Sequence, residues 1–391
     1  MKPVPTIVRD PQRVAELVGR IQSLAPLVER HRDALDRERC LPQPIFDALA
    51  DADLLRLWVP KTLGGFELSP LDFMEVVETA AELEGSVGWI VANGAGMSRI
   101  AGYLPEDVSR SWFADPRTFV AAATGAVGSA TPVAGGYRVT GRWPFASGIH
   151  NATRIMGLCA IAAPGGGPPP KPICCYFAPN DVTIIDTWHV SGLRGTGSCD
   201  FEVDDLFVPA QHVHDLIDAA PTQLGLLYRL PNLSVFPMTV SVWPLGIARA
   251  AISSLVALAS RKVRPGTTQA LRDREAVQAD VGRAEALHGS ARAFLIEAID
   301  ELMAATDVGG ERLVRARARF RIACSHAAES AARIVDVMTA AAGASAIFET
   351  CALERCFRDV HAAVKHVAMS ANNYVVAGRI SLGLPPETQK F

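Results

Sequence analysis

Residues 141–152 read Gly-Arg-Trp-Pro-Phe-Ala-Ser-Gly-Ile-His-Asn-Ala, and the interpretation of the whole chain starts from them. A strand-forming run ends at Pro144 and is followed by a small polar segment that carries Ser147, Gly148 and His150. Proline interrupts the hydrogen bonds of a sheet, and glycine lets the backbone approach a neighbour closely. The stretch is therefore suited to placing backbone and hydroxyl donors against a flat ligand.

The composition predicts a large globular protein. A chain of 391 residues exceeds one ordinary core and predicts two or three packed regions. Its 49% hydrophobic and 20% charged residues argue against disorder. A formal net charge of -3 without a basic tract argues against nucleic acid as a partner.

The pattern of apolar residues predicts neither a membrane protein nor an exported one. The mean hydropathy of +0.18 is high, but charged residues interrupt the apolar segments before the roughly 20 residues that a membrane span needs. The excess of apolar residues is assigned to cores and subunit interfaces. The first residues, Met-Lys-Pro-Val-Pro, lack the apolar stretch of a signal peptide, so a cytoplasmic location is expected.

The eight cysteines lack paired metal-ligand spacing, so they are interpreted as free core thiols and no metal site is expected. Cys174 and Cys175 are adjacent in a strand-like run. Their side chains should point to opposite faces, which argues against a disulfide between them.

The hydrophobic period changes twice along the chain and predicts an α+β protein of three domains. These are an N-terminal helical domain over residues 1–116, a central β-sheet domain over 117–228 and a C-terminal helical bundle over 229–391. Strands and helices do not alternate, so a doubly wound sheet is not expected.

Each domain has its own pattern of elements. The first is helical from Pro11 to about Pro116 and includes a long run over residues 71–103. The second predicts a compact antiparallel sheet, with an exposed hairpin loop at residues 164–172. Its six strand-like runs are residues 119–123, 137–140, 155–159, 173–177, 182–185 and 201–203. Four Ala-rich amphipathic helices in the third domain predict an antiparallel four-helix bundle. They cover residues 242–260, 272–303, 313–341 and 353–377.

The most glycine-dense polar stretch is Gly192-Leu-Arg-Gly-Thr-Gly-Ser198. It resembles a dinucleotide fingerprint, but the third glycine is missing and a strand follows where that motif needs a helix. A nucleotide-binding βαβ unit is therefore rejected. A plain hairpin turn and a turn that contacts a ligand remain equal alternatives.

Two histidines lie in the predicted helix 353–377. His361 and His366 are five residues apart, so they do not share the helix face that a metal pair requires. Each is either a hydrogen-bonded core residue or a general base. The motifs of serine hydrolases, P-loop enzymes and zinc proteases are missing, which argues against those activities.

Together these stretches resemble the acyl-CoA dehydrogenase fold, and within it the two-component flavin-dependent monooxygenases such as the 4-hydroxyphenylacetate and steroid-phenol hydroxylases. The resemblance covers nearly the whole chain. Its carriers are Gly85-Ser-Val-Gly-Trp89, Gly136-Tyr137, Gly141-x-Trp143-x-x-x-Ser147-Gly148, Trp188-x-Val190-x-Gly192-Leu-Arg-Gly-Thr-Gly-Ser198, Val208-Pro209, and Phe357-Arg358-Asp359 with His366.

One position favours oxygenation over dehydrogenation. In dehydrogenases of this fold, a glutamate that removes the substrate α-proton commonly lies eight residues after the aspartate of an Arg-Asp pair. Here Arg358-Asp359 places Val367 at that position, and a valine cannot accept a proton. The neighbouring His366 matches the histidine that hydroxylases of this type direct at the substrate.

The resemblance implies a reaction. A separate reductase supplies reduced FMN or FAD, which reacts with O2 to give a C4a-hydroperoxide that hydroxylates an aromatic, polyketide-like or amine substrate. Ser147 matches the position that hydrogen-bonds near flavin N5, and His366 acts as a base or orienting group. Phenol hydroxylases often carry a histidine at the position of Met97, and a methionine offers no such polar contact to a phenolate. An unusual aromatic, polyketide, indole or amine substrate is therefore expected as much as a simple phenol.

The resemblance also implies a wider set of site residues. Further flavin contacts are expected at Trp143, Trp188, Gly195, Thr196, Gly197, Ser198, Arg261 and Arg264. Substrate contacts are expected at Trp89, Met97 and His366.

The expected assembly is a homotetramer that receives flavin from its reductase, with free diffusion as one route, and without a nucleic acid or membrane partner. Two other functions stay open. One is a dehydrogenase with tightly held FAD and a base elsewhere in the chain. The other is a catalytically silent flavin-binding protein of the same fold.

Overall fold

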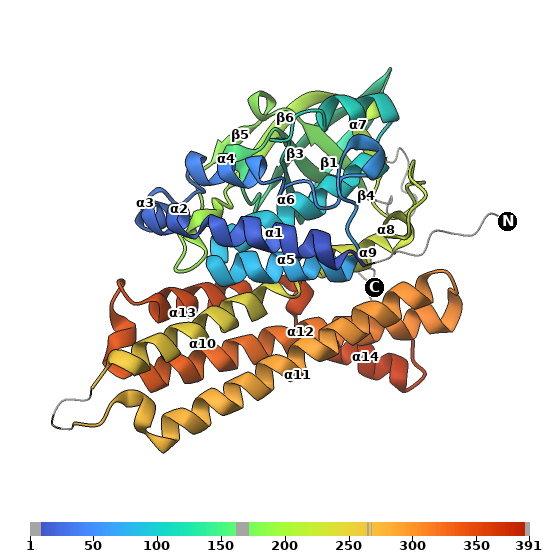
Figure 1. Ribbon diagram of the computed structural model, residues 1–391. Coiled ribbons are helices and arrows are strands. Elements are labelled where there is room, and N and C mark those ends of the chain that lie inside the picture. The colour runs from blue at the N-terminus through green and yellow to red at the C-terminus, as the bar shows by residue number, and fades with distance from the viewer. Residues whose placement is uncertain (1–8, 162–171, 264–265, 267, 388–391) are drawn as a thin grey trace. The chain divides into compact units, whose positions relative to one another are not determined.

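The computed structural model describes residues 9–387 except 162–171, 264–265 and 267. The chain divides into two compact units. Unit 1 comprises Met1–Phe73, Ile90–Val190 and Arg194–Leu233, and unit 2 comprises Met74–Trp89, Ser191–Leu193 and Ser234–Phe391. The order of helices, sheet and helices agrees with the two changes of hydrophobic period (Figure 1). The domain boundaries at 116 and 228 remain a prediction.

The first part of the chain is helical. Its helices are α1 (Pro11–Ser23), α2 (Ala25–Arg30), α3 (Arg32–Glu38), α4 (Gln43–Asp51), α5 (Pro70–Leu83), α6 (Gly85–Met97) and α7 (Glu106–Trp112). The predicted helical run over residues 71–103 is divided in the structure, because Glu84 separates α5 from α6. A carboxylate oxygen of Glu84 accepts the Val87 N–H at 2.8 Å and so caps α6. Gly88 permits the sharp turn, since a Cβ there would lie 2.4 Å from the Cα of Ala81.

Within the described residues, the sheet of unit 1 has seven strands in the order β5-β6-β2-β1-β3-β4-β7. Their bounds are β1 (Val120–Val133), β2 (Gly136–Trp143), β3 (Arg154–Ile161), β4 (Pro172–Phe177), β5 (Thr183–Ile185), β6 (Asp200–Pro209) and β7 (Val213–Asp215). The sequence predicted six of them and missed β7, whose three residues are too few for a periodic pattern. The predicted hairpin loop at 164–172 lies outside the described residues, apart from Pro172 at the start of β4.

The prediction of a purely antiparallel sheet is wrong at one pair, because β1 and β3 run parallel. After β2, residues 144–153 cross the end of the sheet and bring the chain to the other side of β1. The carbonyl of Phe119 accepts the N–H groups of Thr153 at 2.9 Å and Arg154 at 3.2 Å, which starts β3 beside the beginning of β1. The quoted stretch is therefore a crossover, and this explains the parallel pair.

Trp143 forms the centre of the sheet's core. Its ring covers three glycines of adjacent strands, since a Cβ on Gly128, Gly141 or Gly157 would lie 2.3–2.7 Å from the indole. The indole N–H donates to the Leu158 carbonyl at 2.7 Å. The side chain is completely buried, so these contacts hold the strands together.

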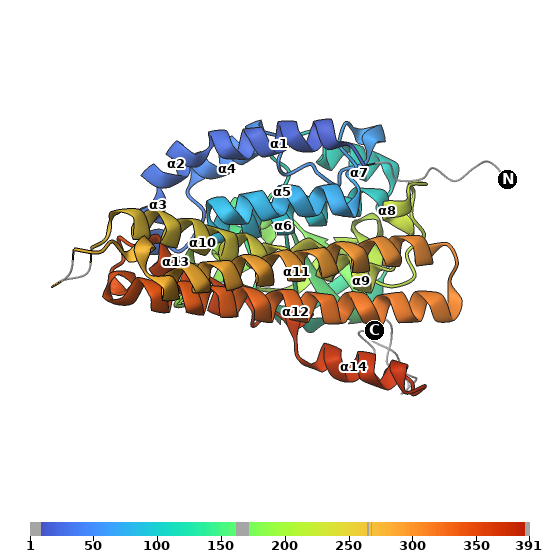
Figure 2. The same cartoon turned by 60° about the horizontal axis from the view of Figure 1, so that its bottom comes forward.

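Unit 2 contains the predicted four-helix bundle. Its principal helices are α10 (Trp243–Arg261), α11 (Glu275–Thr306), α12 (Gly310–Ala342) and α13 (Ala352–Ala363). Helices α10 and α11 lie along α12, and α13 packs on α10 and α12 (Figure 2). Gly309 and Gly343, with φ of 70° and 59°, mark the two ends of α12, which contains the predicted helix 313–341.

The prediction of one helix over residues 353–377 is wrong. Helix α13 ends at Ala363, and α14 (Asn372–Ser381) begins after an irregular segment. His366 has the extended angles φ −65° and ψ 138°, which cannot continue a helix. Its ring accepts the N–H of Ala368 at 3.2 Å and stabilises this break. His366 therefore lies beyond the helix that carries His361.

One segment of the described chain, Asn232–Arg261, is long and apolar enough to cross a membrane, contrary to the reading of the sequence. It forms two helices, α9 (Asn232–Val240) and α10. Sixty-one per cent of its most apolar window is buried, as in a core helix of a soluble protein.

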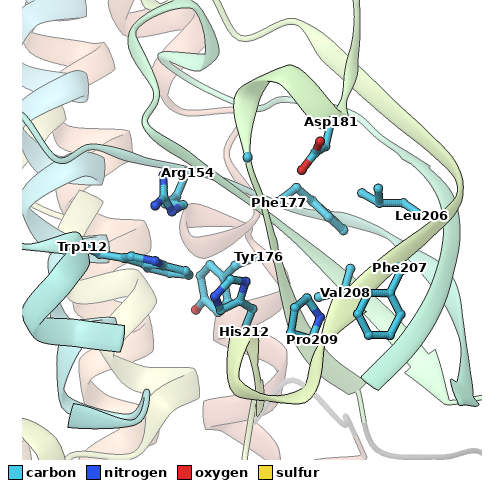
Figure 3. Close-up of a pocket in the computed structure, with 11 residues that line it drawn as sticks. Trp112, Arg154, Tyr176, Phe177, Asp181, Leu206, Phe207, Val208, Pro209 and His212 are labelled. Carbon is cyan, nitrogen blue, oxygen red and sulfur yellow. The ribbon is translucent and has the colours of Figure 1, made fainter. Parts of the chain in front are cut away.

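A pocket opens in unit 1 where the end of α7 faces the ends of β4 and β6 (Figure 3). It is lined by residues of unit 1 alone.

Candidate active site

Three hydroxyl groups form a buried chain in unit 1. Ser147 Oγ lies 2.8 Å from Ser198 Oγ, which lies 2.7 Å from Thr196 Oγ1. The backbone joins the same segments, because the Gly148 N–H donates to the Thr196 carbonyl at 2.8 Å. The structure thus brings the crossover and the glycine-rich turn together. The predicted Gly195, Thr196, Gly197 and Ser198 all lie in this turn.

Two glycines permit this close approach. Gly148 has φ of 73°, and a Cβ there would lie 2.7 Å from the Phe119 ring and 3.0 Å from Ile90. Gly197 has φ of 52° and faces Cys40 at 3.1 Å. Both left-handed backbones favour glycine, and the first site also lacks room for any side chain.

Phe145 is a functional candidate that the sequence did not single out. Its side chain is 63% exposed although it lies beside the buried Ser147, and its φ of 66° is unusual for a non-glycine residue. Its ring lies 6.3 Å from that of Trp188, edge to face. Strained backbone conformations cluster at functional sites, which makes this exposed ring a candidate contact. The only sequence signal was an aromatic residue among small ones after a proline.

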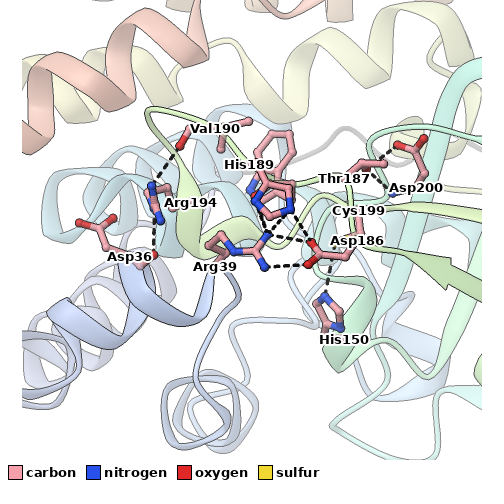
Figure 4. A network of polar contacts seen from close by, with 11 residues as sticks. Asp36, Arg39, His150, Asp186, Thr187, His189, Val190, Arg194, Cys199 and Asp200 are labelled. Atoms are coloured by element: carbon pink, nitrogen blue, oxygen red, sulfur yellow. Dashed lines mark hydrogen bonds and ion pairs between the residues drawn. The ribbon is translucent and has the colours of Figure 1, made fainter.

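A polar network holds the segment that carries Trp188 (Figure 4). Arg39 donates two hydrogen bonds of 2.7 Å to the carboxylate of Asp186, and one of 3.2 Å to the carbonyl of Trp188. The two bonds to the carboxylate lower the pKa of Asp186. The Thr187 hydroxyl is bonded to Asp200 at 2.9 Å. Trp188 is thus held half-buried by its neighbours.

The remaining predicted residues lie in different settings. Trp143 is completely buried in the sheet and presents no surface to a ligand, so we leave it out of the proposed flavin contacts. Met97 is buried at the end of α6 in unit 1. Arg261 is exposed at the end of α10 in unit 2. Arg264 lies outside the described residues.

An aromatic cluster in unit 2 contains the predicted histidine. The ring of His366 lies 5.4 Å from that of Trp89, edge to face, and Trp89 lies 4.4 Å from Trp243. The indole N–H of Trp243 donates to the Gly85 carbonyl at 2.8 Å, which fixes the cluster to the start of α6.

The contacts of His366 determine what it can do. Burial lowers its pKa to about 4, so the ring is neutral at neutral pH. Nδ1 accepts the N–H of Ala368, so the proton of the neutral ring belongs on Nε2. The Nε2–H of this tautomer can therefore donate a hydrogen bond. His361 is different, because its Nε2 lies 2.8 Å from a carboxylate oxygen of Asp336 on the surface of unit 2.

The Arg358-Asp359 pair has a structural task in unit 2. Asp359 accepts the Leu193 N–H at 2.6 Å, and Arg358 donates to the Ser191 carbonyl at 2.8 Å. Burial, and then the nearby Glu84, raise the pKa of Asp359. Val367, at the position of the dehydrogenase base, is 59% exposed and carries no carboxylate.

Comparison with known proteins identifies the family. The chain matches the model of the acyl-CoA dehydrogenase N-terminal domain over residues 22–115 and that of the acyl-CoA dehydrogenase C-terminal domain over residues 238–371. It is 32% identical over 351 residues to an indole-3-acetate monooxygenase of Pseudomonas putida, with 90% of each chain covered. The chain is a flavin-dependent monooxygenase of the acyl-CoA dehydrogenase fold.

Other monooxygenases of this family are similar over nearly their whole length. The oxygenase subunit HsaA of Mycobacterium tuberculosis is 28% identical, with 97% of each chain covered. The structure of XiaF from a Streptomyces species, in complex with FADH2, has a TM-score of 0.88 and 25% identity, covering 97% of this chain and 98% of XiaF. The protein is thus the oxygenase component of a flavin system that works with reduced flavin and O2, and its relatives imply a reductase partner.

Proposed function

We propose that this monooxygenase hydroxylates an aromatic or polyketide-like substrate through an acceptor group that His366 binds. The observation that carries the proposal is the Nε2–H of His366, defined by the bond from Ala368 and lying in a cluster with Trp89. A neutral donor suits a phenolate, carbonyl or carboxylate oxygen. It suits an ammonium group poorly, because that group needs an acceptor.

We assign the flavin to the crossover and turn of unit 1. The proposed contacts are Ser147, Trp188, Gly195, Thr196, Gly197 and Ser198, with Phe145 added. Their chemistry fits an isoalloxazine ring, because neutral hydroxyls and aromatic edges match a flat ring with polar edge atoms. When bound, the reduced flavin supplies the two electrons with which O2 yields one hydroxyl on the substrate and one water.

In this proposal the chain's own residues position groups and exclude water. The buried Ser147 hydroxyl, fixed by Ser198, offers one oriented hydrogen bond at the flavin edge. His366 orients the substrate oxygen and does not remove a proton, because its pKa is too low for a base at neutral pH. Substrate ionisation is therefore not assigned to His366.

The substrate class rests on chemistry and on one relative. The indole-3-acetate monooxygenase of Pseudomonas putida is named for an aromatic acid. An aromatic ring with an oxygen acceptor agrees with both the Trp89 cluster and the Nε2–H donor. FMN and FAD remain alternatives as the flavin.

We further propose a cytoplasmic homotetramer whose flavin arrives from the reductase by diffusion. Unit 2 exposes several large apolar side chains, which favours burial against other subunits. They include Ile347, Phe348, Val375 and Leu382. Light scattering after size-exclusion chromatography would measure the mass, and a monomer at micromolar concentration would contradict this assignment.

The test of the function couples the protein to a generic flavin reductase under 18O2 with a panel of phenols, indoles and aromatic acids. We expect one labelled oxygen per product molecule. If every substrate yields hydrogen peroxide alone, the proposal is wrong. Tightly bound FAD that an acyl-CoA reduces would instead favour the dehydrogenase alternative.

A further inference from the structure

The pocket of unit 1 shares no lining residue with the proposed flavin or substrate contacts. Its volume is about 290 Å³, which suits a ligand of one or two rings. Trp112, Tyr176 and Phe177 supply aromatic walls, and Arg154 and His212 lie among them (Figure 3). None of these five residues belongs to the proposed flavin or substrate contacts.

Arg154 is the cation of this pocket. It forms no ion pair with any residue that the structure describes, and its one hydrogen bond there runs from Nη1 to the Thr153 carbonyl at 2.6 Å. Burial lowers the pKa of the guanidinium, yet it remains charged at neutral pH. A partly buried cation without a counter-ion is costly, and an anion would offset that cost. The remaining N–H donors of its planar fork match a carboxylate.

The aromatic residues hold that guanidinium in place. Its central carbon lies 4.7 Å from the centre of the Trp112 ring, a cation–π contact. The Trp112 ring in turn lies 5.0 Å from His212 and 5.7 Å from Tyr176. The Tyr176 hydroxyl lies 2.8 Å from Nε2 of His214, which fixes the wall behind the ring.

The electrostatics favour an anion at one side of the pocket. Burial, and then the charge of Arg154, lower the pKa of His212, so that imidazole is neutral at neutral pH. Arg154 is thus the single full positive charge among the lining residues. Asp181 lies at another side of the pocket and is exposed (Figure 3). Its carboxylate would accept a bond from a hydroxyl or amino group.

We propose that this pocket is a second binding site, for a small aromatic carboxylate that carries a hydroxyl or amino substituent. The carboxylate binds the Arg154 fork, the ring packs against Trp112 and its aromatic neighbours, and the substituent faces Asp181. The ligand is bound without reaction, because none of the pocket's lining residues belongs to the proposed flavin contacts.

The test is calorimetric titration of the flavin-free protein with 4-hydroxybenzoate and with its neutral isostere 4-hydroxybenzamide. No reduced flavin is present, so turnover cannot interfere. The acid should bind at least about tenfold more tightly than the amide, as expected for a charge-assisted bond of 1.4 kcal/mol or more. Equal affinities would overturn the proposal.

Variants locate the site. Arg154→Gln should reduce affinity for the acid to that for the amide, whereas Arg142→Gln, on the same sheet and paired with Asp200, should leave it unchanged. His366→Ala should also leave it unchanged. Loss of binding in that variant would assign the ligand to the proposed active site and overturn the second site.

If Arg154→Gln fails to fold, tryptophan fluorescence of the wild-type protein provides a second test of the site. The acid should change tryptophan fluorescence, and Trp112→Phe should remove most of that change while the melting temperature shows a folded protein. A fluorescence change that persists in Trp112→Phe would contradict the site. The outcome is independent of whether the protein hydroxylates any substrate.

Discussion

The imidazole of His366 meets the indole of Trp89 edge-on in unit 2, with ring centres 5.4 Å apart and planes inclined by 70°. Because Nδ1 accepts the Ala368 N–H, the proton of the neutral ring belongs on Nε2. This geometry distinguishes His366 from His361, whose Nε2 is engaged with Asp336.

Replacing His366 tests its role as a donor. We expect His366→Ala to lower kcat/KM by about tenfold to a hundredfold, the range for a lost hydrogen bond to a charged group, while flavin binding is retained. His366→Gln keeps a side-chain N–H donor and should recover part of the activity. His361→Ala is the control and should be near wild type. Equal loss of flavin binding and product in His366→Ala would indicate a structural histidine.

The low pKa of His366 predicts a specific dependence of stability on pH. Its folded-state pKa of about 4 lies below the unfolded value of about 6.5, so the unfolded chain binds the proton first as pH falls. This residue's contribution to stability is complete above pH 6.5 and is lost as pH falls from 6.5 towards 4. Urea unfolding at several pH values should show a smaller loss for His366→Gln than for wild type. Parallel curves would contradict the assigned pKa.

Removing the Ser147 hydroxyl tests the proposed flavin contact. Ser147→Ala should divert consumed O2 from product to hydrogen peroxide, and the ratio of product to O2 should fall by about three- to tenfold, as for the loss of one hydrogen bond. Ser260→Ala, at an exposed serine of α10, is the control. An unchanged ratio of product to O2 in Ser147→Ala would remove Ser147 from the site.

Phe145 should show opposite effects on stability and binding. Glycine relieves its positive φ, so Phe145→Gly should leave the free energy of unfolding unchanged or raise it by up to about 1 kcal/mol. The same change removes an exposed ring and should weaken flavin binding, measured by fluorescence titration. Val133→Ala, at another exposed apolar residue of unit 1, should do neither. Flavin affinity equal to wild type in Phe145→Gly would show that the ring is not a contact.

The crossover depends on Gly148. Gly148→Ala places a Cβ 2.7 Å from Phe119 on a backbone with φ of 73°, so we expect a loss of about 2–4 kcal/mol from strain and overpacking together. Gly19→Ala in α1 meets nothing within 4 Å and should be neutral or stabilising. Thermal unfolding measures both, and a wild-type melting temperature for Gly148→Ala would contradict the geometry.

Local properties of the chain are sufficient for part of this protein. Hydrophobic periods of 3.6 and 2 residues determine the order of helices, sheet and helices. The reason is local, because the period of a helix or strand decides which side chains of that segment point to the same face. Gly309 and Gly343 mark the ends of α12 for the same reason, since a left-handed backbone favours glycine wherever it occurs. The resemblance of residues 141–148 to the family also predicts Ser147 as a flavin contact, and that assignment remains a prediction.

Long-range packing decided the rest. The parallel pairing of β1 and β3 and the bond between Ser147 and Ser198 join residues far apart in the chain, so no local period encodes them. Trp143 became a core residue because glycines of three strands meet beneath its ring. The break in the helix at His366 lets Nδ1 accept the Ala368 N–H, and this bond leaves the ring proton on Nε2. The sequence thus determined the order of the elements and the candidate site residues, and tertiary contacts decided which atoms of those residues are buried or hydrogen-bonded.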